Sequence, residues 1–349
     1  LYAYVSRGLL VSHPAPTGRR RLFDVDDVER LARRSRESRP SDTRVASITT
    51  SVTQLTDRGP CYRGQAAIDL AVSSTFEGAA EVVWGADGAE AEPGAWAALP
   101  MGPPPAGFSS LDRIRWAVLS AGAGDPLRSD ARPERVRRTA RRLVAAAVDV
   151  LEPTPSGTTA EDPTTEEPPA PEEHDLMVER SRRPLAATLT ARLTPVVTAP
   201  RVRAVDAALV VLADHELATS TMAVRLAAST RADVYDALLA GLSTLAGPLH
   251  GGASPNAYAL LEAARRHGAR RGLDDTLRWQ GRLHGFGHSV YRDGDPRFEV
   301  LWDRFREVAG PEDRQLAEEI LELAEREAVP FPNVDLALAA IAWSTGMAA

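Results

Sequence analysis

The sequence contains no lysine, because all 41 of its Lys and Arg residues are arginines. A chain without lysine cannot form a Schiff base with a carbonyl substrate, and it cannot supply the lysine of a Walker-type phosphate loop. Arginine is the better planar, bidentate ligand of carboxylates and phosphates. We interpret the missing lysine first as base bias of the genome and only second as selection for such ligands.

Cysteine is nearly absent as well. The single Cys61 excludes an intrachain disulfide and a cysteine-rich zinc site, and its neighbours favour a structural thiol over a nucleophile. No apolar run is long enough to cross a bilayer, and the first residues lack the pattern of a secretory signal, so the cytoplasm is the expected location. The net charge of −7 argues against a protein that coats nucleic acid.

The first 44 residues differ in charge from the rest, with ten arginines against six acidic residues, a local net charge of +4. Residues 1–8 indicate a short helix, residues 11–23 a hairpin, and residues 24–37 a second helix. This pattern resembles the second half of a winged helix-turn-helix of the MerR or excisionase kind, although a degenerate module kept for packing remains an alternative. The candidate DNA-binding residues are Tyr4, Arg7, Arg19, Arg20 and Arg21.

Helical spacing of apolar residues dominates from about residue 45 to the C-terminus, and alternating strand patterns are almost absent outside the hairpin. The sequence therefore predicts an all-α fold. Residues 152–175 interrupt this pattern with eight acidic residues, no arginine, and many prolines and threonines. Such a composition cannot bury enough apolar surface to offset the entropy of ordering, so it predicts a disordered loop.

Four polar residues outside this loop stand in unusual settings. Glycines flank His250 and His288, acidic residues flank His215, and Asp335 follows two prolines where a helix is about to begin. Taken singly, each has a plain explanation as a turn histidine or a helix cap. His284 and His288 are spaced like a metal pair, but the glycines between them break the helix that such spacing needs, so no metal is expected.

Taken together, these residues belong to three motifs. The motifs are Gly247-Pro248-Leu249-His250-Gly251-Gly252, Gly285-Phe286-Gly287-His288 with Asp295-Pro296-Arg297, and Pro332-Asn333-Val334-Asp335. Their order and spacing resemble those of the citrate synthase family. The resemblance runs from about residue 60 to the C-terminus and is interrupted only by the acidic loop.

The resemblance implies that acetyl-CoA condenses with oxaloacetate to give citrate and CoA in a homodimer, with no cofactor or metal. It makes Asp335 the base, His250 the hydrogen-bond donor to the thioester oxygen, and His288 the group that polarises the ketone. It assigns His215 and Arg297 to the carboxylates of oxaloacetate. The positions that match the CoA-binding side are Gly285, Phe286, Gly287, Arg292 and Asn333.

The resemblance also implies a domain organisation. The winged module covers residues 1–44, a large domain covers 45–251, a small domain covers 252–330, and residues 331–349 return to the large domain. The sequence departs from the family where Ser254-Pro255 follows the His250 motif and where Ala328 or a neighbour replaces a basic residue. It also stops soon after Asp335, where the family carries further substrate arginines, and it lacks an initiating Met, so we interpret it as a piece of a longer enzyme.

Three other functions stay open. A 2-methylcitrate synthase would use propionyl-CoA, and one methylene is worth only about 1–3 kcal/mol in an apolar pocket. A DNA-binding regulator could use a citrate synthase-like domain to sense a metabolite, which would explain the basic N-terminus. An inactive subunit paired with an active paralogue is a weaker alternative. The sequence does not distinguish oligomer size or allosteric ligands.

Overall fold

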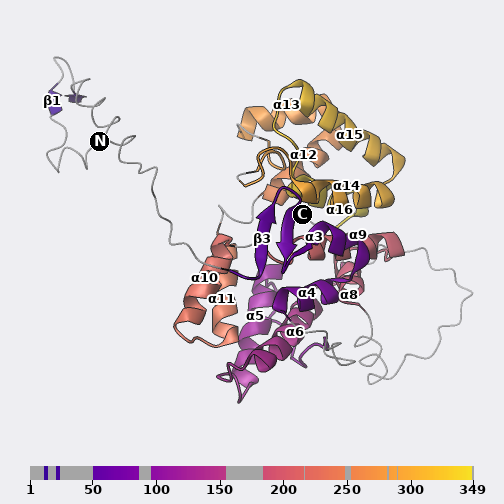
Figure 1. Ribbon diagram of the computed structural model, residues 1–349. Coiled ribbons are helices and arrows are strands. Elements are labelled where there is room, and N and C mark those ends of the chain that lie inside the picture. The colour runs from indigo at the N-terminus through magenta and orange to yellow at the C-terminus, as the bar shows by residue number, and fades with distance from the viewer. Residues whose placement is uncertain are drawn as a thin grey trace, which may run out of the picture. The chain divides into compact units, whose positions relative to one another are not determined.

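The computed structural model in Figure 1 describes residues 12–14, 21–23, 50–85, 96–154, 184–215, 217–247, 253–280, 283–288 and 290–347. Its backbone contacts divide the chain into two compact units, Leu1–Thr50 and Ser51–Ala349.

The described part of the first unit is a β-hairpin. Strand β1 (Ser12–Pro14) pairs antiparallel with β2 (Arg21–Phe23), so that Ser12 lies opposite Phe23. The hairpin predicted over residues 11–23 is therefore confirmed. The two helices predicted beside it, together with the side chains of the five candidate DNA-binding residues, lie outside the described residues.

The second unit begins with a three-stranded antiparallel sheet in the order β3–β4–β5. Its strands are β3 (Thr53–Thr56), β4 (Gly59–Tyr62) and β5 (Gln65–Ala66). The prediction of a helical chain from residue 45 onward is wrong here. The strands are only two to four residues long and are joined by tight turns with positive φ at Gly59, Arg63 and Gly64, so no alternating pattern is long enough to detect.

Helices form the rest of the second unit, which makes its described part mostly helical as predicted. The first group is α3 (Ala67–Ser73), α4 (Phe76–Trp84), α5 (Ser110–Gly124), α6 (Pro133–Asp149), α8 (Leu185–Leu193), α9 (Ala199–Val211), α10 (Thr219–Ser229) and α11 (Val234–Leu245). The second group is α12 (Ala253–His267), α13 (Ala269–Gln280), α14 (Pro296–Val308), α15 (Pro311–Arg326) and α16 (Val334–Thr345). Helices α12 to α16 gather at one end of the unit (Figure 1).

One large apolar core joins α12–α16 to α3 and α9. At its centre, Trp302 of α14 and Trp343 of α16 are almost fully buried. The Trp302 ring stacks on Phe298 at 5.0 Å and tilts against Phe305 at 4.5 Å between centroids. Burying such large side chains contributes several kcal/mol in total, which makes α14 and α16 a rigid support for the residues at their N-termini.

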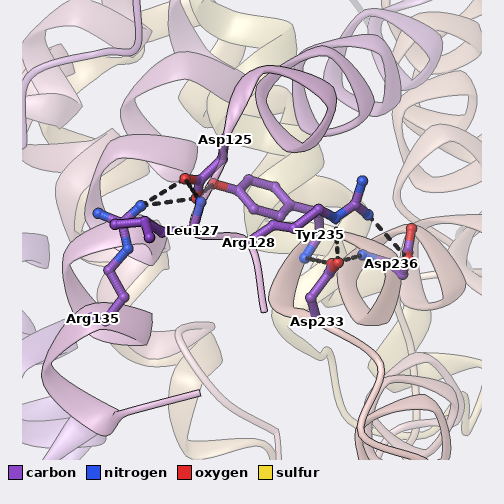
Figure 2. A network of polar contacts seen from close by, with 7 residues as sticks. All are labelled: Asp125, Leu127, Arg128, Arg135, Asp233, Tyr235 and Asp236. Atoms are coloured by element: carbon purple, nitrogen blue, oxygen red, sulfur yellow. Dashed lines mark hydrogen bonds and ion pairs between the residues drawn. The ribbon is translucent and has the colours of Figure 1, made fainter. Parts of the chain in front are cut away.

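A polar network instead ties the loop between α5 and α6 to the start of α11 (Figure 2). Asp125 accepts hydrogen bonds from the Tyr235 hydroxyl at 2.7 Å and from Arg135 at 2.8 Å. Arg128 donates to Asp233 at 2.5 Å and to Asp236 at 3.1 Å, and Asp233 also caps α11. Charge-assisted bonds thus fix a corner where the apolar core is small.

Two further findings concern other predictions. No helix in the described part of the chain has the length and apolar character needed to span a membrane. The predicted disordered loop, residues 152–175, lies outside the described residues except for its first three. The proposed division into large and small domains at residues 252 and 330 stays a prediction.

Candidate active site

Two of the sequence motifs lie side by side at the N-terminus of α16. Phe286 and Pro332 form an antiparallel bridge, the Gly287 amide donates to the Phe331 carbonyl at 2.7 Å, and the Asn333 amide donates to the Gly285 carbonyl at 2.9 Å. These backbone bonds place the loop that carries His288 against the start of the helix that carries Asp335.

Glycine is required at the contact between this loop and α16. Gly285 has a φ of +86°, and a Cβ built on it would lie 2.9 Å from the Cβ of Leu336 and 3.2 Å from that of Ala257. Any other residue would push the loop away from both α12 and α16. The glycine at this position of the motif therefore allows the loop backbone to lie close to α12 and α16.

Asn333 and Asp295 hold the start of α16. The Asn333 side chain caps the helix by accepting from the Asp335 amide at 3.0 Å, and its Nδ2 donates to the Gly287 carbonyl at 2.6 Å. Asp295, the N-cap of α14, accepts from the Val334 amide at 3.0 Å. The starts of α14 and α16 are thus tied together through one carboxylate.

The same carboxylate forms a buried ion pair with Arg297. The Nε and Nη2 of Arg297 each donate to a different oxygen of Asp295 at 2.9 Å, and the Arg297 side chain is 2% exposed. Burial alone would raise the pKa of Asp295, but the bonds and charge of Arg297 outweigh it, so this pKa lies below its usual value. Within the described residues, Nη1 of Arg297 makes no hydrogen bond.

His288 stands beside this pair with a defined tautomer. Its Nδ1 accepts from the Val290 amide at 3.1 Å and the Tyr291 amide at 3.2 Å, so the neutral ring carries its proton on Nε2. Nε2 lies 3.3 Å from Nη2 of Arg297, and because a guanidinium only donates, this contact is not a hydrogen bond in that tautomer. Burial, together with the charge of Arg297, lowers the pKa of His288 and favours the neutral ring.

His215 comes from a distant part of the chain, just after α9. Its ring lies 5.7 Å from the His288 ring, edge to face. Its Nε2 is buried and has no hydrogen-bond partner within the described residues. Burial and the charge of Arg297 lower the pKa of His215 as well, so two neutral imidazoles and one guanidinium meet at this point.

The small sheet holds the segment of His215 in place. The hydroxyl of the fully buried Tyr62 donates to the Val210 carbonyl at 2.9 Å and accepts from the Asp214 amide at 3.4 Å. Thr53 of β3 donates to the Asp214 side chain. These long-range contacts fix the chain on both sides of the end of α9.

Asp335 lies in the first turn of α16, where the positive end of the helix dipole favours a carboxylate. Its Oδ1 accepts from the Ser254 hydroxyl at 2.6 Å. Asp335 is half-buried, and its charge reaches His288 and opposes the lowering of that pKa. A carboxylate, two imidazoles and a guanidinium of different segments therefore share one electrostatic environment.

The structure brings together four of the five residues that the sequence singled out for catalysis and oxaloacetate: His215, His288, Arg297 and Asp335. His250 lies outside the described residues. Of the positions expected on the CoA side, Gly285, Phe286, Gly287 and Asn333 form the backbone pairing, whereas Arg292 is exposed on the loop before α14. A cavity of about 620 Å³ opens beside this loop, between it and the turn after β3.

Sequence reasoning assigned no role to two residues of this cluster. The Tyr291 ring lies 4.8 Å from the His288 ring and 5.1 Å from the Arg297 guanidinium, and its hydroxyl is buried without a partner among the described residues. Ser254 was noticed only as a departure from the family pattern. Tyr291 could have been found from its position three residues after His288 in the sequence. Nothing in the sequence indicated that Ser254 contacts Asp335.

The comparisons with known proteins identify the family of this chain. The family model "Citrate synthase, C-terminal domain" matches residues 102–349. A citrate synthase of Deinococcus radiodurans is 30% identical over 240 residues, which cover 66% of this chain and 60% of the relative. The "Citrate/2-methylcitrate synthase" of Bacillus subtilis is 34% identical over 148 residues, 41% of this chain and 40% of the relative.

The chain thus spans between two fifths and three fifths of the length of these two relatives. Among solved structures, that of a citrate synthase from Thermoplasma acidophilum, in a ternary complex with carboxymethyl coenzyme A and oxaloacetate, has a TM-score of 0.63 at 19% identity. The match covers 87% of this chain and 84% of the Thermoplasma acidophilum chain, which establishes a shared fold. The chain belongs to the citrate synthase family.

Proposed function

We propose that this chain condenses acetyl-CoA with oxaloacetate and water to give citrate and CoA, with no cofactor beyond these substrates. The observation that carries the proposal is the convergence of His215, His288, Arg297 and Asp335 from three separate segments. Such a set supplies a base, a proton donor and two ligands for carboxylates, which are the groups that this reaction needs.

The first step is removal of a proton from the acyl methyl group. The Asp335 carboxylate takes the proton, and the electrons of the broken C–H bond form the enolate of the thioester. His250 donates a hydrogen bond to the enolate oxygen; this role rests on the family resemblance, because His250 lies outside the described residues. Asp335 is half-buried, so part of the surrounding water is excluded where the proton is taken.

The second step forms the carbon–carbon bond. The Nε2–H of His288 donates a hydrogen bond to the ketone oxygen of oxaloacetate, and the enolate carbon attacks the ketone carbon. The alkoxide that forms takes the Nε2 proton, and the ring regains a proton from water. We assign Nη1 of Arg297 and Nε2 of His215 to the carboxylates of oxaloacetate, because neither makes a hydrogen bond within the described residues. Water then hydrolyses the thioester and releases CoA.

We assign CoA to the side of the loop that runs from Gly285 to Arg292. Gly285, Phe286, Gly287 and Asn333 shape this side through their backbone pairing, and exposed Arg292 offers a guanidinium to a phosphate. The relative from Bacillus subtilis is named for both citrate and 2-methylcitrate, so propionyl-CoA is the alternative acyl donor.

A homodimer is part of the proposal. Helix α10 contains no buried residue, and two of its apolar side chains are open to solvent: Leu226 is 72% exposed and Met222 is 38% exposed. A helix with exposed apolar residues on a solvent face is suited to packing against a second copy. Size-exclusion chromatography with light scattering should give twice the chain mass, and Leu226→Asp should reduce it.

The β-hairpin of the first unit favours one further function. Strand β2 begins at Arg21, which Arg19 and Arg20 precede in the sequence, and a hairpin with such a basic run suits contact with DNA phosphates, as in a winged helix-turn-helix. Binding of the full chain to duplex DNA that weakens steeply with salt, and that is lost when all three arginines become alanine, would support DNA binding.

The test of the enzyme is oxaloacetate-dependent release of free thiol from acetyl-CoA, with propionyl-CoA measured beside it. Asp335→Asn should lower turnover by at least about a thousandfold, since the base is lost. Asp303→Asn makes the same chemical change at an exposed position of α14 and should leave turnover intact. Absence of turnover with both acyl-CoAs from folded wild-type protein would refute the proposed activity.

A further inference from the structure

The hydroxyl of Ser254 makes its hydrogen bond to the proposed base. It lies 2.6 Å from Oδ1 of Asp335, and because an ionised carboxylate has no proton to give, the hydroxyl is the donor. Ser254 lies in the first turn of α12, but within the described residues its side chain makes no bond to the amides of that helix. Its hydroxyl therefore serves Asp335 and does not cap its own helix.

The rest of the Asp335 surroundings leave the other carboxylate oxygen available. The Asp335 amide is bonded to the Asn333 side chain, and Oδ2 accepts no hydrogen bond from any described residue. Two rigid helices that pack closely, α12 and α16, present the two partners. The contact thus fixes the rotation of the carboxylate and leaves Oδ2 without a bond to any described residue.

The bond is compatible with both protonation states of the base. When Oδ2 takes the methyl proton, Oδ1 becomes the carbonyl oxygen of a neutral acid, and a carbonyl oxygen still accepts from a hydroxyl. No proton leaves Ser254 in the step, and the C–H electron pair remains on the substrate as the enolate. A bond that survives the transfer holds the carboxylate in the geometry that the transfer requires.

We propose that Ser254 is a positioning residue that holds Asp335 through Oδ1, so that Oδ2 alone faces the acyl methyl group. This inference rests on the proposed synthase activity. It assigns a function to a serine that stands where this sequence departs from the family pattern, and it makes the first turn of α12 part of the machinery of proton abstraction.

The experiment compares Ser254→Ala, Ser254→Thr and wild type in the full chain. Ser254→Ala should lower kcat about 10- to 100-fold while each KM changes less than about twofold, because orientation and not binding is lost. The primary isotope effect with trideuterated acetyl-CoA should rise, since proton abstraction becomes slower. Ser254→Thr keeps the hydroxyl and should recover most of kcat.

Two controls isolate the role. Ser344→Ala removes a hydroxyl from the last turn of α16 and should keep the wild-type kcat and isotope effect. In an Asp335→Asn background, adding Ser254→Ala should change residual turnover by less than about twofold, because a positioning residue acts through its partner.

The outcomes separate this inference from the function it depends on. Wild-type turnover with an unchanged kcat and isotope effect in Ser254→Ala would overturn the role of Ser254 and leave the synthase standing. A loss of kcat that Ser254→Thr does not restore, with both KM values raised, would show a structural role and also overturn it. No turnover from folded wild type would refute the synthase, and this role with it.

Discussion

The two halves of the candidate site are held by different means. The His288, Arg297 and Asp335 half is built from segments joined by backbone pairing, a helix cap and a buried ion pair. The His215 half is held by side chains of the small sheet, more than 140 positions earlier in the chain. The first half resists distortion because Asp295 and Asn333 each make several hydrogen bonds that join its segments, whereas the second depends on a few single hydrogen bonds.

This difference indicates which substitutions should affect the whole site and which should affect a single residue of it. Replacing a residue of the interlocked half disturbs stability and chemistry together, because the same carboxylate supports a guanidinium and a helix start. Replacing a supporting residue of the His215 half should affect mainly His215, the proposed ligand of an oxaloacetate carboxylate. Three experiments, ordered by expected size of effect, test this contrast.

Asp295→Asn should have the largest effect. It leaves the Arg297 guanidinium buried without a counter-charge, which costs about 3–5 kcal/mol of unfolding free energy, and it misplaces Arg297 and α16. Urea unfolding and thiol release measure the two losses. Asp69→Asn removes a carboxylate from an exposed pair with Arg58 and should cost less than about 1 kcal/mol with turnover unchanged. Equal losses in the two variants would contradict the contrast.

Tyr62→Phe should have an intermediate effect. It removes one hydrogen bond from the Val210 carbonyl and one from the Asp214 amide, which should cost about 1–3 kcal/mol of unfolding free energy in total, and it loosens His215. The KM for oxaloacetate should rise about tenfold while that for acetyl-CoA stays unchanged. Tyr235→Phe removes the same hydroxyl from the network in Figure 2 and should lower stability without changing either KM. A rise in the KM for oxaloacetate in both variants would show a general loosening of the fold.

The smallest effect should come from pH. Because the folded protein lowers the pKa of both His215 and His288, the unfolded chain binds more protons below about pH 6.5, so the free energy of unfolding should fall as the pH drops through that region. Urea unfolding at pH 7.5 and 5.5 measures the slope. His288→Asn should reduce the slope, and an identical slope in wild type and variant would exclude His288 as a contributor.

Local motifs made one half of the site predictable. Gly285 is needed where the loop approaches α16, and Asn333 is needed where that helix begins. The backbone geometry at these positions requires particular residue types, which the sequence shows directly. The small sheet was not predictable in this way, because its strands are too short to show an alternating pattern of apolar and polar residues. The predicted helical start of the domain was wrong for that reason.

The sequence by itself determined the mostly helical class, the hairpin near the N-terminus, and the residue types of the reactive cluster. Those follow from periodicity, turn residues and motifs, which act over a few positions. Only the tertiary structure decided that Tyr62 and Thr53 support His215, that the Tyr291 ring lies close to both His288 and Arg297, and that Ser254 bonds to Asp335. These contacts join segments or ring faces whose approach depends on how helices pack around one core, and packing of that kind leaves no periodic signal in the chain.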